Sequence, residues 1–353
     1  VVPDFDRINP EYFRFMDRKI AYLNAHGMIP FIEVSRRDAG PVWKKYYDWP
    51  DSYARFIQYV FARYQAYNVL LSPIHYDASV YTHDSREYNA PANAVIDRYG
   101  HPPFGTLVGT NSSPSSLVNF GGPDEARWLT FHQIGNRRPH GNYWYLTEIY
   151  HAEPSRPALN GEPYYPGFPD DDPPAPSDTA ARYCRSGIYG SLLSGGLAGY
   201  IYGAEGMWGG NVEDDAAYTI WDAIEYQSGG QVRHVLRFLE PCQGAYADLV
   251  PEHELLAHSR TGDPSGYDGW AYCAYMPGKR VVLLYFERGA KQTTVRSLLP
   301  RTRYELHWFD PRTGAWGEEG VDLETDQTGR SVLPGLPTDD DWAAVLRASE
   351  NRD

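Results

Sequence analysis

Two acidic residues are the strongest candidates for chemistry, because each follows a short apolar run of the kind that forms a buried strand. Asp77 comes soon after the run at 68–74, and Glu162 comes soon after the run at 158–160. Two carboxyl groups about 5–5.5 Å apart can cleave a glycosidic bond with retention, one as nucleophile and the other as acid and base. Each acid alone also has a simpler interpretation, in which Asp77 caps a turn and Glu162 pairs with an arginine.

A second set of side chains stands at or just beyond the ends of the expected strands, where a substrate could be held. The candidates for substrate binding are His75, Tyr76, Thr110, His132, Tyr165, Glu205 and Trp208. His75 and His132 could equally be structural histidines with satisfied hydrogen bonds. Tyr165 and Trp208 could be core residues, and Glu205 could pair with an arginine.

The aromatic content is compatible with a sugar-binding protein. Tyr, Trp and Phe make up 15% of the 353 residues. Flat rings fill protein cores, but they also form the walls on which the apolar faces of sugars stack. The aromatic content by itself therefore leaves both interpretations open.

Neither a cofactor nor a metal site is expected. No GxGxxG run follows the first expected strand, so a dinucleotide fold has no support. Cys184, Cys242 and Cys273 are widely spaced and odd in number, which is typical of buried free thiols, with one incidental disulfide as the alternative. The acidic run at 170–172 lacks the glycine and glutamate of a calcium loop.

The charge balance narrows the choice of partner. The chain has 46 acidic and 32 basic residues, a net charge of −14, whereas a nucleic-acid binder needs a basic face. No stretch approaches the roughly 20 apolar residues of a membrane span. The expected partner is an oligosaccharide or polysaccharide substrate, with no nucleic acid and no membrane, and the cellular location is left open.

The first 240 residues alternate between helical and strand patterns. Asn9, Pro10 and Glu11 form a helix start, with a capping side chain, a proline in the first turn and an early acid. Gly27 can close this helix in a left-handed conformation. Strands are expected at 28–34, 68–74, 105–110, 129–134, 158–160 and 199–203. Further helices are expected at 52–66, 143–151, 179–193 and 216–239.

This alternation predicts a parallel sheet, and about six strand–helix units imply an α/β fold that is either a barrel or a doubly wound sheet. Of the two, we expect a (β/α)₈ TIM barrel. Such a barrel has eight strands, and its active site lies at their carboxyl ends. We therefore expect residues 1–245 to supply barrel strands three to eight, without the first two. A partner chain or an N-terminal segment missing from this sequence would then complete the barrel. Asp77 and Glu162 would end strands four and seven, on opposite sides of the barrel mouth.

Residues 246–353 have a different pattern. Short apolar or alternating runs at 267–275, 280–286, 304–309 and 343–346 are separated by turns such as Pro277-Gly278 and Thr313-Gly314. This pattern predicts a small all-β sandwich.

Several motifs resemble the apiosidase-like family of glycoside hydrolases. They are NPEYF at 9–13, YLN at 22–24, HG at 26–27, the helix at 182–196 with the GY and YG pairs at 199–203, and most specifically PALNGEPYY at 157–165. In the C-terminal region, WFDPRTG at 308–314 and DW at 341–342 resemble the β-sandwich that usually accompanies this family and is conventionally labelled collagen-binding. Many relatives have Gly-Gly-Asp where this chain has His75-Tyr76-Asp77.

The resemblance implies a retaining glycoside hydrolase with Glu162 as the nucleophile and Asp77 as the acid/base. It also implies a substrate that carries a terminal apiose- or arabinose-like pentofuranose, or a related glycoside, on a plant-type or other complex glycan. The alternative is a non-catalytic carbohydrate-binding or structural protein with a vestigial, incomplete barrel.

Overall fold

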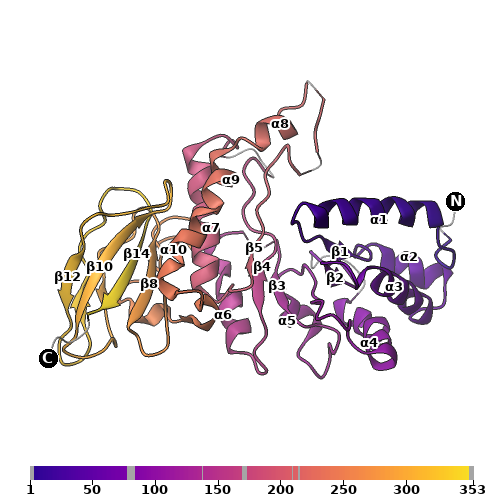
Figure 1. Cartoon of the computed structure of the whole chain (residues 1–353), viewed down its shortest axis with the longest axis horizontal. Helices are drawn as coiled ribbons and strands as arrows, with labels where there is room; N and C mark the ends of the chain where they lie inside the picture. Colours follow the sequence, from indigo (N-terminus) through magenta and orange to yellow (C-terminus); the bar gives the residue numbers. More distant parts are fainter. Residues whose placement is uncertain are drawn as a thin grey trace. The chain divides into compact units, whose positions relative to one another are not determined.

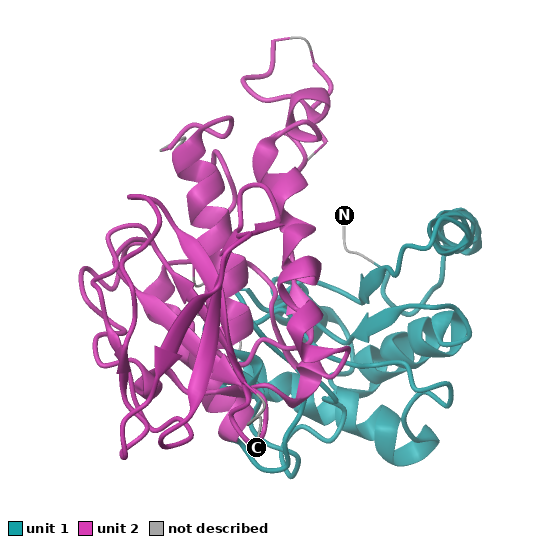
Figure 2. Cartoon of the chain, turned by 60° about the vertical axis from the view of Figure 1, so that its left-hand side comes forward, with its two compact units in different colours: residues 1–136, 152–157 teal, residues 137–151, 158–353 magenta. Residues whose placement is uncertain are grey.

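The computed structural model describes residues 4–77, 84–136, 138–168, 173–208, 210–213 and 215–349. The chain divides into two compact units (Figure 2). Unit 1 comprises residues 1–136 and 152–157, and unit 2 comprises residues 137–151 and 158–353. The division into units does not test the expected boundary between 245 and 246, which stays a prediction.

Unit 1 is a mixed α/β structure with helices and short strands (Figure 1). Its α-helices are α1 (Pro10–Ala25), α2 (Ala39–Tyr46), α3 (Asp51–Tyr64), α4 (Asn89–Tyr99) and α5 (Ser116–Phe120), and its strands are β1 (Phe31–Glu33), β2 (Leu70–Ser72) and β3 (His132–Ile134). The start of α1 is as predicted, because the Asn9 side chain accepts from the backbone N–H groups of Glu11 and Tyr12. Gly27 has a φ of 75°, in the left-handed region expected of a residue that ends a helix.

The strands of unit 1 confirm the parallel arrangement but are shorter than expected. β1 pairs with β2 in parallel, with Glu33 opposite Ser72. The strand expected at 105–110 is reduced to one parallel bridge between Leu71 and Val108. Gly105 has a left-handed φ of 71°, which interrupts an extended run at its start.

Unit 2 combines a short parallel pair with a large antiparallel sheet (Figure 1). Its α-helices are α6 (Trp144–His151), α7 (Asp178–Leu193), α8 (Ile220–Ala223), α9 (Gln227–Val232) and α10 (His234–Phe238). Its parallel pair is β4 (Ala158–Asn160) with β5 (Gly199–Tyr200). Its remaining strands are β6 (Val250–Pro251), β7 (Ala271–Tyr275), β8 (Val281–Phe286), β9 (Thr294–Val295), β10 (Arg303–Asp310), β11 (Ala315–Trp316), β12 (Val321–Glu324), β13 (Ser331–Val332) and β14 (Trp342–Ala348).

The antiparallel sheet confirms the all-β prediction for the C-terminal region. Its strand order is β11-β10-β14-β8-β7-β6, with β12 added to β10. Side chains alternate between two cores, as the twofold repeat of a strand requires. Tyr272, Leu283 and Val345 pack with helix α7, whereas Cys273, Leu284 and Leu346 pack with residues of the β9–β13 pair. Both faces of the sheet are therefore covered within unit 2.

The helix expected at 216–239 is wrong as a single element, because the chain forms the three short helices α8, α9 and α10. Tyr226 has an extended backbone with ψ of 132°, which ends helical geometry between α8 and α9. Its ring is buried against Ala175, Ala204 and Ala223, and this packing outweighs local helix propensity. Within the described part of the chain, no helix is long and apolar enough to cross a membrane.

Candidate active-site residues

Asp77 lies in a chain of charged side chains within unit 1, which we call the Asp77 cluster (Glu33, Arg37, His75 and Asp77). Arg37 forms an ion pair with Asp77 Oδ1, and His75 Nε2 lies 3.3 Å from Asp77 Oδ2. On the other side of the ring, His75 Nδ1 lies 2.7 Å from Glu33 Oε2. Both oxygens of Asp77 are thus engaged, and its side chain is only 14% exposed.

The local backbone explains why these four side chains meet. Glu33 ends β1, and the chain continues beside the segment after β2 through a parallel bridge between Arg36 and His75. The His75 N–H donates to Ser35 O at 2.8 Å, and the Arg37 N–H donates to His75 O at 2.9 Å. Residues that follow two neighbouring parallel strands are therefore held at the same edge.

Tyr76, Thr110 and His132 are all buried in unit 1. The Tyr76 ring packs against Tyr88 and Phe120, and burial raises the pKa of its phenol. Thr110 is fully buried, and its hydroxyl donates to the main-chain oxygen of Ile74. Their assignment as substrate-binding residues stays a prediction, to which this placement lends no support.

His132 is held as a neutral side chain. It is 3% exposed, and its Nδ1 lies 2.9 Å from the hydroxyl of Ser116. Burial, reinforced by the positive charge of Arg156, lowers its pKa to about 4. The same Ser116 hydroxyl accepts the N–H of Gln133, so the histidine belongs to a local network that fixes β3.

Glu162 is positioned in unit 2 by the end of β4. Its N–H donates to Asn160 Oδ1 at 3.3 Å, and Asn160 Nδ2 donates to the Ser191 hydroxyl of α7 at 2.9 Å. Asn160 and Ser191 are fully buried, so the turn that carries Glu162 is tied to a rigid helix. Glu162 itself is half-buried.

Aromatic side chains surround the segment that follows Glu162. The Tyr165 ring is 8% exposed, and burial, followed by the negative charge of Glu162, raises the pKa of its phenol. Phe168 contacts Trp208 with ring centroids 5.1 Å apart. Trp208 is 58% exposed, so its indole is available to solvent.

Arg138 joins these rings and is a residue that the sequence analysis missed. Its guanidinium carbon lies 5.2 Å from the centroid of Tyr165 and 4.6 Å from that of Phe168. Its Nη1 donates to Phe168 O at 3.3 Å. The only signal for Arg138 in the sequence was its position four residues beyond the end of β3. It was missed because the candidate residues were restricted to the strand ends themselves.

Glu205 also belongs to this neighbourhood of unit 2. The Glu205 N–H donates to Pro166 O at 2.9 Å. In the turn after β5, the backbones of Glu205 and Trp208 form an isolated β-bridge. A Cβ atom on Gly167 would lie 3.0 Å from Glu205 Cβ, so the two segments are in contact. We call Arg138, Glu162, Tyr165, Phe168, Glu205 and Trp208 the Glu162 cluster. Unit 2 thus brings together four of the predicted site residues.

The family of the chain follows from a comparison of its sequence. The sequence model of the apiosidase-like catalytic domain matches residues 2–244, which include every residue of both clusters. The chain belongs to the apiosidase-like family. No curated protein matches the sequence.

Solved structures show that this apiosidase-like chain has a glycoside hydrolase fold. A structure named glycoside hydrolase is 16% identical with a TM-score of 0.74, over 96% of this chain and 77% of that one. A glycoside hydrolase family 5 structure from Bacteroides vulgatus ATCC 8482 is 15% identical with a TM-score of 0.73, over 95% of this chain and 74% of that one. Family and fold together support a glycosidase.

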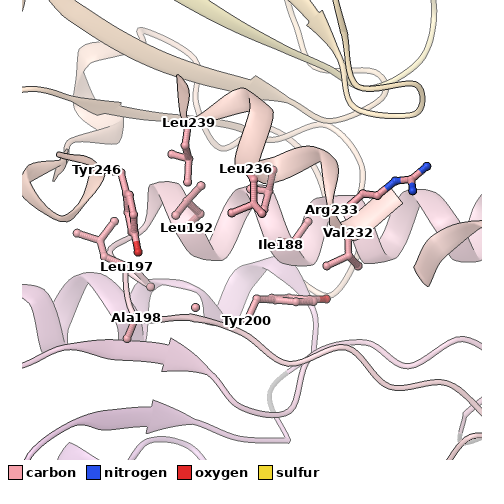
Figure 3. Close-up of a pocket in the computed structure, with 13 residues that line it drawn as sticks. Ile188, Leu192, Leu197, Ala198, Tyr200, Val232, Arg233, Leu236, Leu239 and Tyr246 are labelled. Carbon is pink, nitrogen blue, oxygen red and sulfur yellow. The ribbon is translucent and has the colours of Figure 1, made fainter. Parts of the chain in front are cut away.

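A cavity elsewhere in unit 2 of the apiosidase-like chain, away from the Glu162 cluster, does not fit a sugar. It has a volume of about 280 Å³ and lies against α7, α10 and the residues around β5 (Figure 3). Its lining is mainly apolar, with Leu192, Leu197 and Leu236 among the contributors, and Arg233 points its guanidinium away. A sugar needs convergent polar groups, which this cavity does not offer. Among the described residues, no group of three or more His, Cys, Asp or Glu could hold a metal ion.

Proposed function

We propose that this protein is a retaining glycoside hydrolase in which Glu162 is the nucleophile and Asp77 the acid/base. The observation that carries the proposal is the Glu162 cluster, where the segment that follows this strand-end carboxylate packs its rings Tyr165 and Phe168 against Arg138, in a chain of the apiosidase-like family. The scaffold of the proposal is a (β/α)₈ barrel that presents both acids at the carboxyl ends of its strands.

In the proposed mechanism, the Glu162 carboxylate attacks the anomeric carbon while protonated Asp77 gives its proton to the leaving oxygen. Asp77 then takes a proton from the water that releases the sugar from Glu162. Retention requires the two carboxyl groups to approach within about 5–6 Å. The proposed substrate carries a terminal apiose- or arabinose-like pentofuranose on a plant-type or other complex glycan.

His75 is held between two carboxylates, because one ring nitrogen faces Glu33 and the other faces Asp77. We propose that His75, itself fixed by Glu33, orients the Asp77 carboxyl group toward the substrate. His75 is therefore a positioning residue in this scheme.

One observation favours the alternative of a non-catalytic carbohydrate-binding protein. Both oxygens of Asp77 already have partners in Arg37 and His75, an arrangement that a purely structural carboxylate would also show. A catalytic Asp77 must release at least one of them during turnover, whereas a structural one never does.

The two functions are separated by hydrolysis of a panel of aryl glycosides. We expect Glu162→Gln to abolish turnover on every substrate, with Glu240→Gln as an exposed acid-to-amide control that stays active. Asp77→Asn should lose less activity on substrates with good leaving groups, and azide should partly restore it. If the unaltered chain hydrolyses none of the panel but binds the glycan, the non-catalytic function is correct.

A further inference from the structure

The segment that carries α8 leads into α9 (Figure 1). A second pocket in unit 2 is lined mainly by residues of this segment. It has a volume of about 470 Å³, within the range of about 300–1,000 Å³ that is usual for small-molecule sites. We call it the α8 pocket. The lining residues that matter here are Tyr218, Trp221, Asp222, Glu225 and Gln227.

One wall of the α8 pocket is an exposed aromatic surface. Trp221 is 65% exposed, and it makes no ring contact with any residue in the described part of the chain. Tyr218 provides a second ring, which is held in place because its hydroxyl accepts the N–H of Ala175 at 3.4 Å. Exposed indole next to polar groups is the surface on which the apolar face of a sugar stacks.

The other side of the α8 pocket is lined by hydrogen-bond acceptors. Asp222 is oriented by a capping box with Thr219, and Glu225 is exposed with no ion pair to any described residue. Gln227 donates its amide to Asp178 at 2.7 Å, which leaves its carbonyl oxygen as an acceptor. Acceptors of this kind suit the hydroxyl groups of a sugar.

The charge of the α8 pocket selects against an acidic ligand. Asp222 and Glu225 are its charged lining residues, and no lysine or arginine is among those that line it. A uronic acid would bring a third carboxylate into this acidic site, and like charges at short range cost binding energy. A neutral sugar residue avoids that repulsion.

The α8 pocket adjoins the Glu162 cluster within unit 2. A Cβ atom on Gly167 would lie 3.3 Å from the Tyr218 ring and 3.0 Å from Glu205 Cβ. Gly167 therefore lies between Tyr218 of the α8 pocket and Glu205 of the Glu162 cluster. In addition, a Cβ atom on Gly206 would lie 2.6 Å from Thr219 O, the residue before α8. The segments that carry the two sites are therefore packed against each other within unit 2.

We propose that the α8 pocket binds a neutral sugar residue of the glycan, stacked on Trp221 and hydrogen-bonded to Asp222 and Glu225. The inference rests on the proposed function, because it assigns a more distant residue of the same substrate to this pocket. It predicts that the protein prefers neutral oligosaccharides to polyuronates of the same length.

The test measures binding by isothermal titration calorimetry, in the Glu162→Gln background so that no turnover interferes. The probes are neutral hexasaccharides of β-1,4-linked xylose, glucose and mannose, and a hexamer of galacturonic acid. We expect at least one neutral hexasaccharide to bind and Trp221→Ala to weaken it about tenfold, the loss of one stacking contact. Trp144→Ala, which alters an exposed tryptophan of α6, is the matched control and should leave binding unchanged.

Three results would overturn the inference: no binding by any neutral hexasaccharide, equal binding by the Trp221→Ala and Trp144→Ala variants, or tighter binding of the galacturonate hexamer that depends on Trp221. The outcome is separate from that of the proposed function. If the unaltered chain hydrolyses no glycoside but binds a neutral hexasaccharide through Trp221, only the catalytic proposal is refuted. If it hydrolyses glycosides but binding does not depend on Trp221, only the sugar site in the α8 pocket is refuted.

Discussion

Arg138 is the single side chain that most directly links the aromatic rings of the Glu162 cluster. The attraction between a partly buried cation and an aromatic ring is worth about 1–2 kcal/mol, and the Arg138 guanidinium lies near both Tyr165 and Phe168. We expect Arg138→Met, which keeps the aliphatic stem, to lower kcat/KM about tenfold or more while the chain stays folded. Arg98→Met removes a cation over the exposed Tyr99 ring and should leave kcat/KM unchanged. Equal kinetics in the two variants would contradict a role for Arg138 in substrate positioning.

His132 should make the stability of unit 1 depend on pH. Its pKa is about 4 when folded, against an ordinary value near 6.5, so below pH 6.5 the unfolded chain binds a proton that the folded chain does not. The free energy of unfolding therefore has its full value above pH 6.5 and falls as the pH drops toward 4. The decrease due to His132 is about 3 kcal/mol at most. His132→Gln should flatten the pH dependence of the free energy of unfolding between pH 7 and 4, measured with urea. The control His101→Gln, at an exposed histidine, should keep the pH dependence of the unaltered chain.

The turn after β5 depends on a glycine that gives room to Tyr165. A Cβ atom at Gly203 would lie 2.9 Å from the Tyr165 ring, closer than real Cβ contacts. Gly203→Ala should therefore displace the ring, destabilise the fold by about 1–3 kcal/mol and lower activity. Gly230 in α9 has nothing within 4 Å of its Cβ position, so Gly230→Ala should be neutral or slightly stabilising. A Gly203→Ala variant with unaltered stability and kinetics would show that this packing is unimportant.

Elements with strong local signals were predictable from the sequence. The cap at Asn9 and the short apolar runs that form β7, β8 and β14 are local properties, and the structure confirms them. The break at Tyr226 was not predictable, because it depends on distant alanines that bury the ring. Arg138 was missed because it lies beyond the end of β3, and the rings that mark its role, Tyr165 and Phe168, come from a segment far away in sequence.

At the scale of the whole molecule, a buried ion pair ties α7 to the C-terminal sheet within unit 2. Arg185 donates to both oxygens of Asp341, which is fully buried, and Tyr285 donates to the same carboxylate at 3.0 Å. Removing one partner of such a pair leaves an uncompensated buried charge. The contact therefore joins the region of the predicted C-terminal sandwich, residues 246–353, to a helix that precedes it in sequence.

We expect Asp341→Asn to destabilise unit 2 by about 3–5 kcal/mol in urea unfolding, because it removes the buried carboxylate that pairs with Arg185. The remaining counter-charge is Asp340, which is partly exposed and lies 3.9 Å from the guanidinium. Asp322 pairs with Arg303 at the exposed surface, so Asp322→Asn should cost less than about 1 kcal/mol. A similar small loss in both variants would show that the Arg185–Asp341 pair contributes little to the stability of unit 2.

The central claim, that Glu162 is the nucleophile of a retaining glycosidase, is tested most directly by trapping the covalent intermediate. A 2-deoxy-2-fluoro analogue of an aryl glycoside that the protein hydrolyses should slow the second step and leave the sugar on the nucleophile. Peptide mass spectrometry should then find the sugar on Glu162, in the peptide that spans the end of β4. A sugar on another residue, or no adduct together with an initial product of inverted anomeric configuration, would contradict the account.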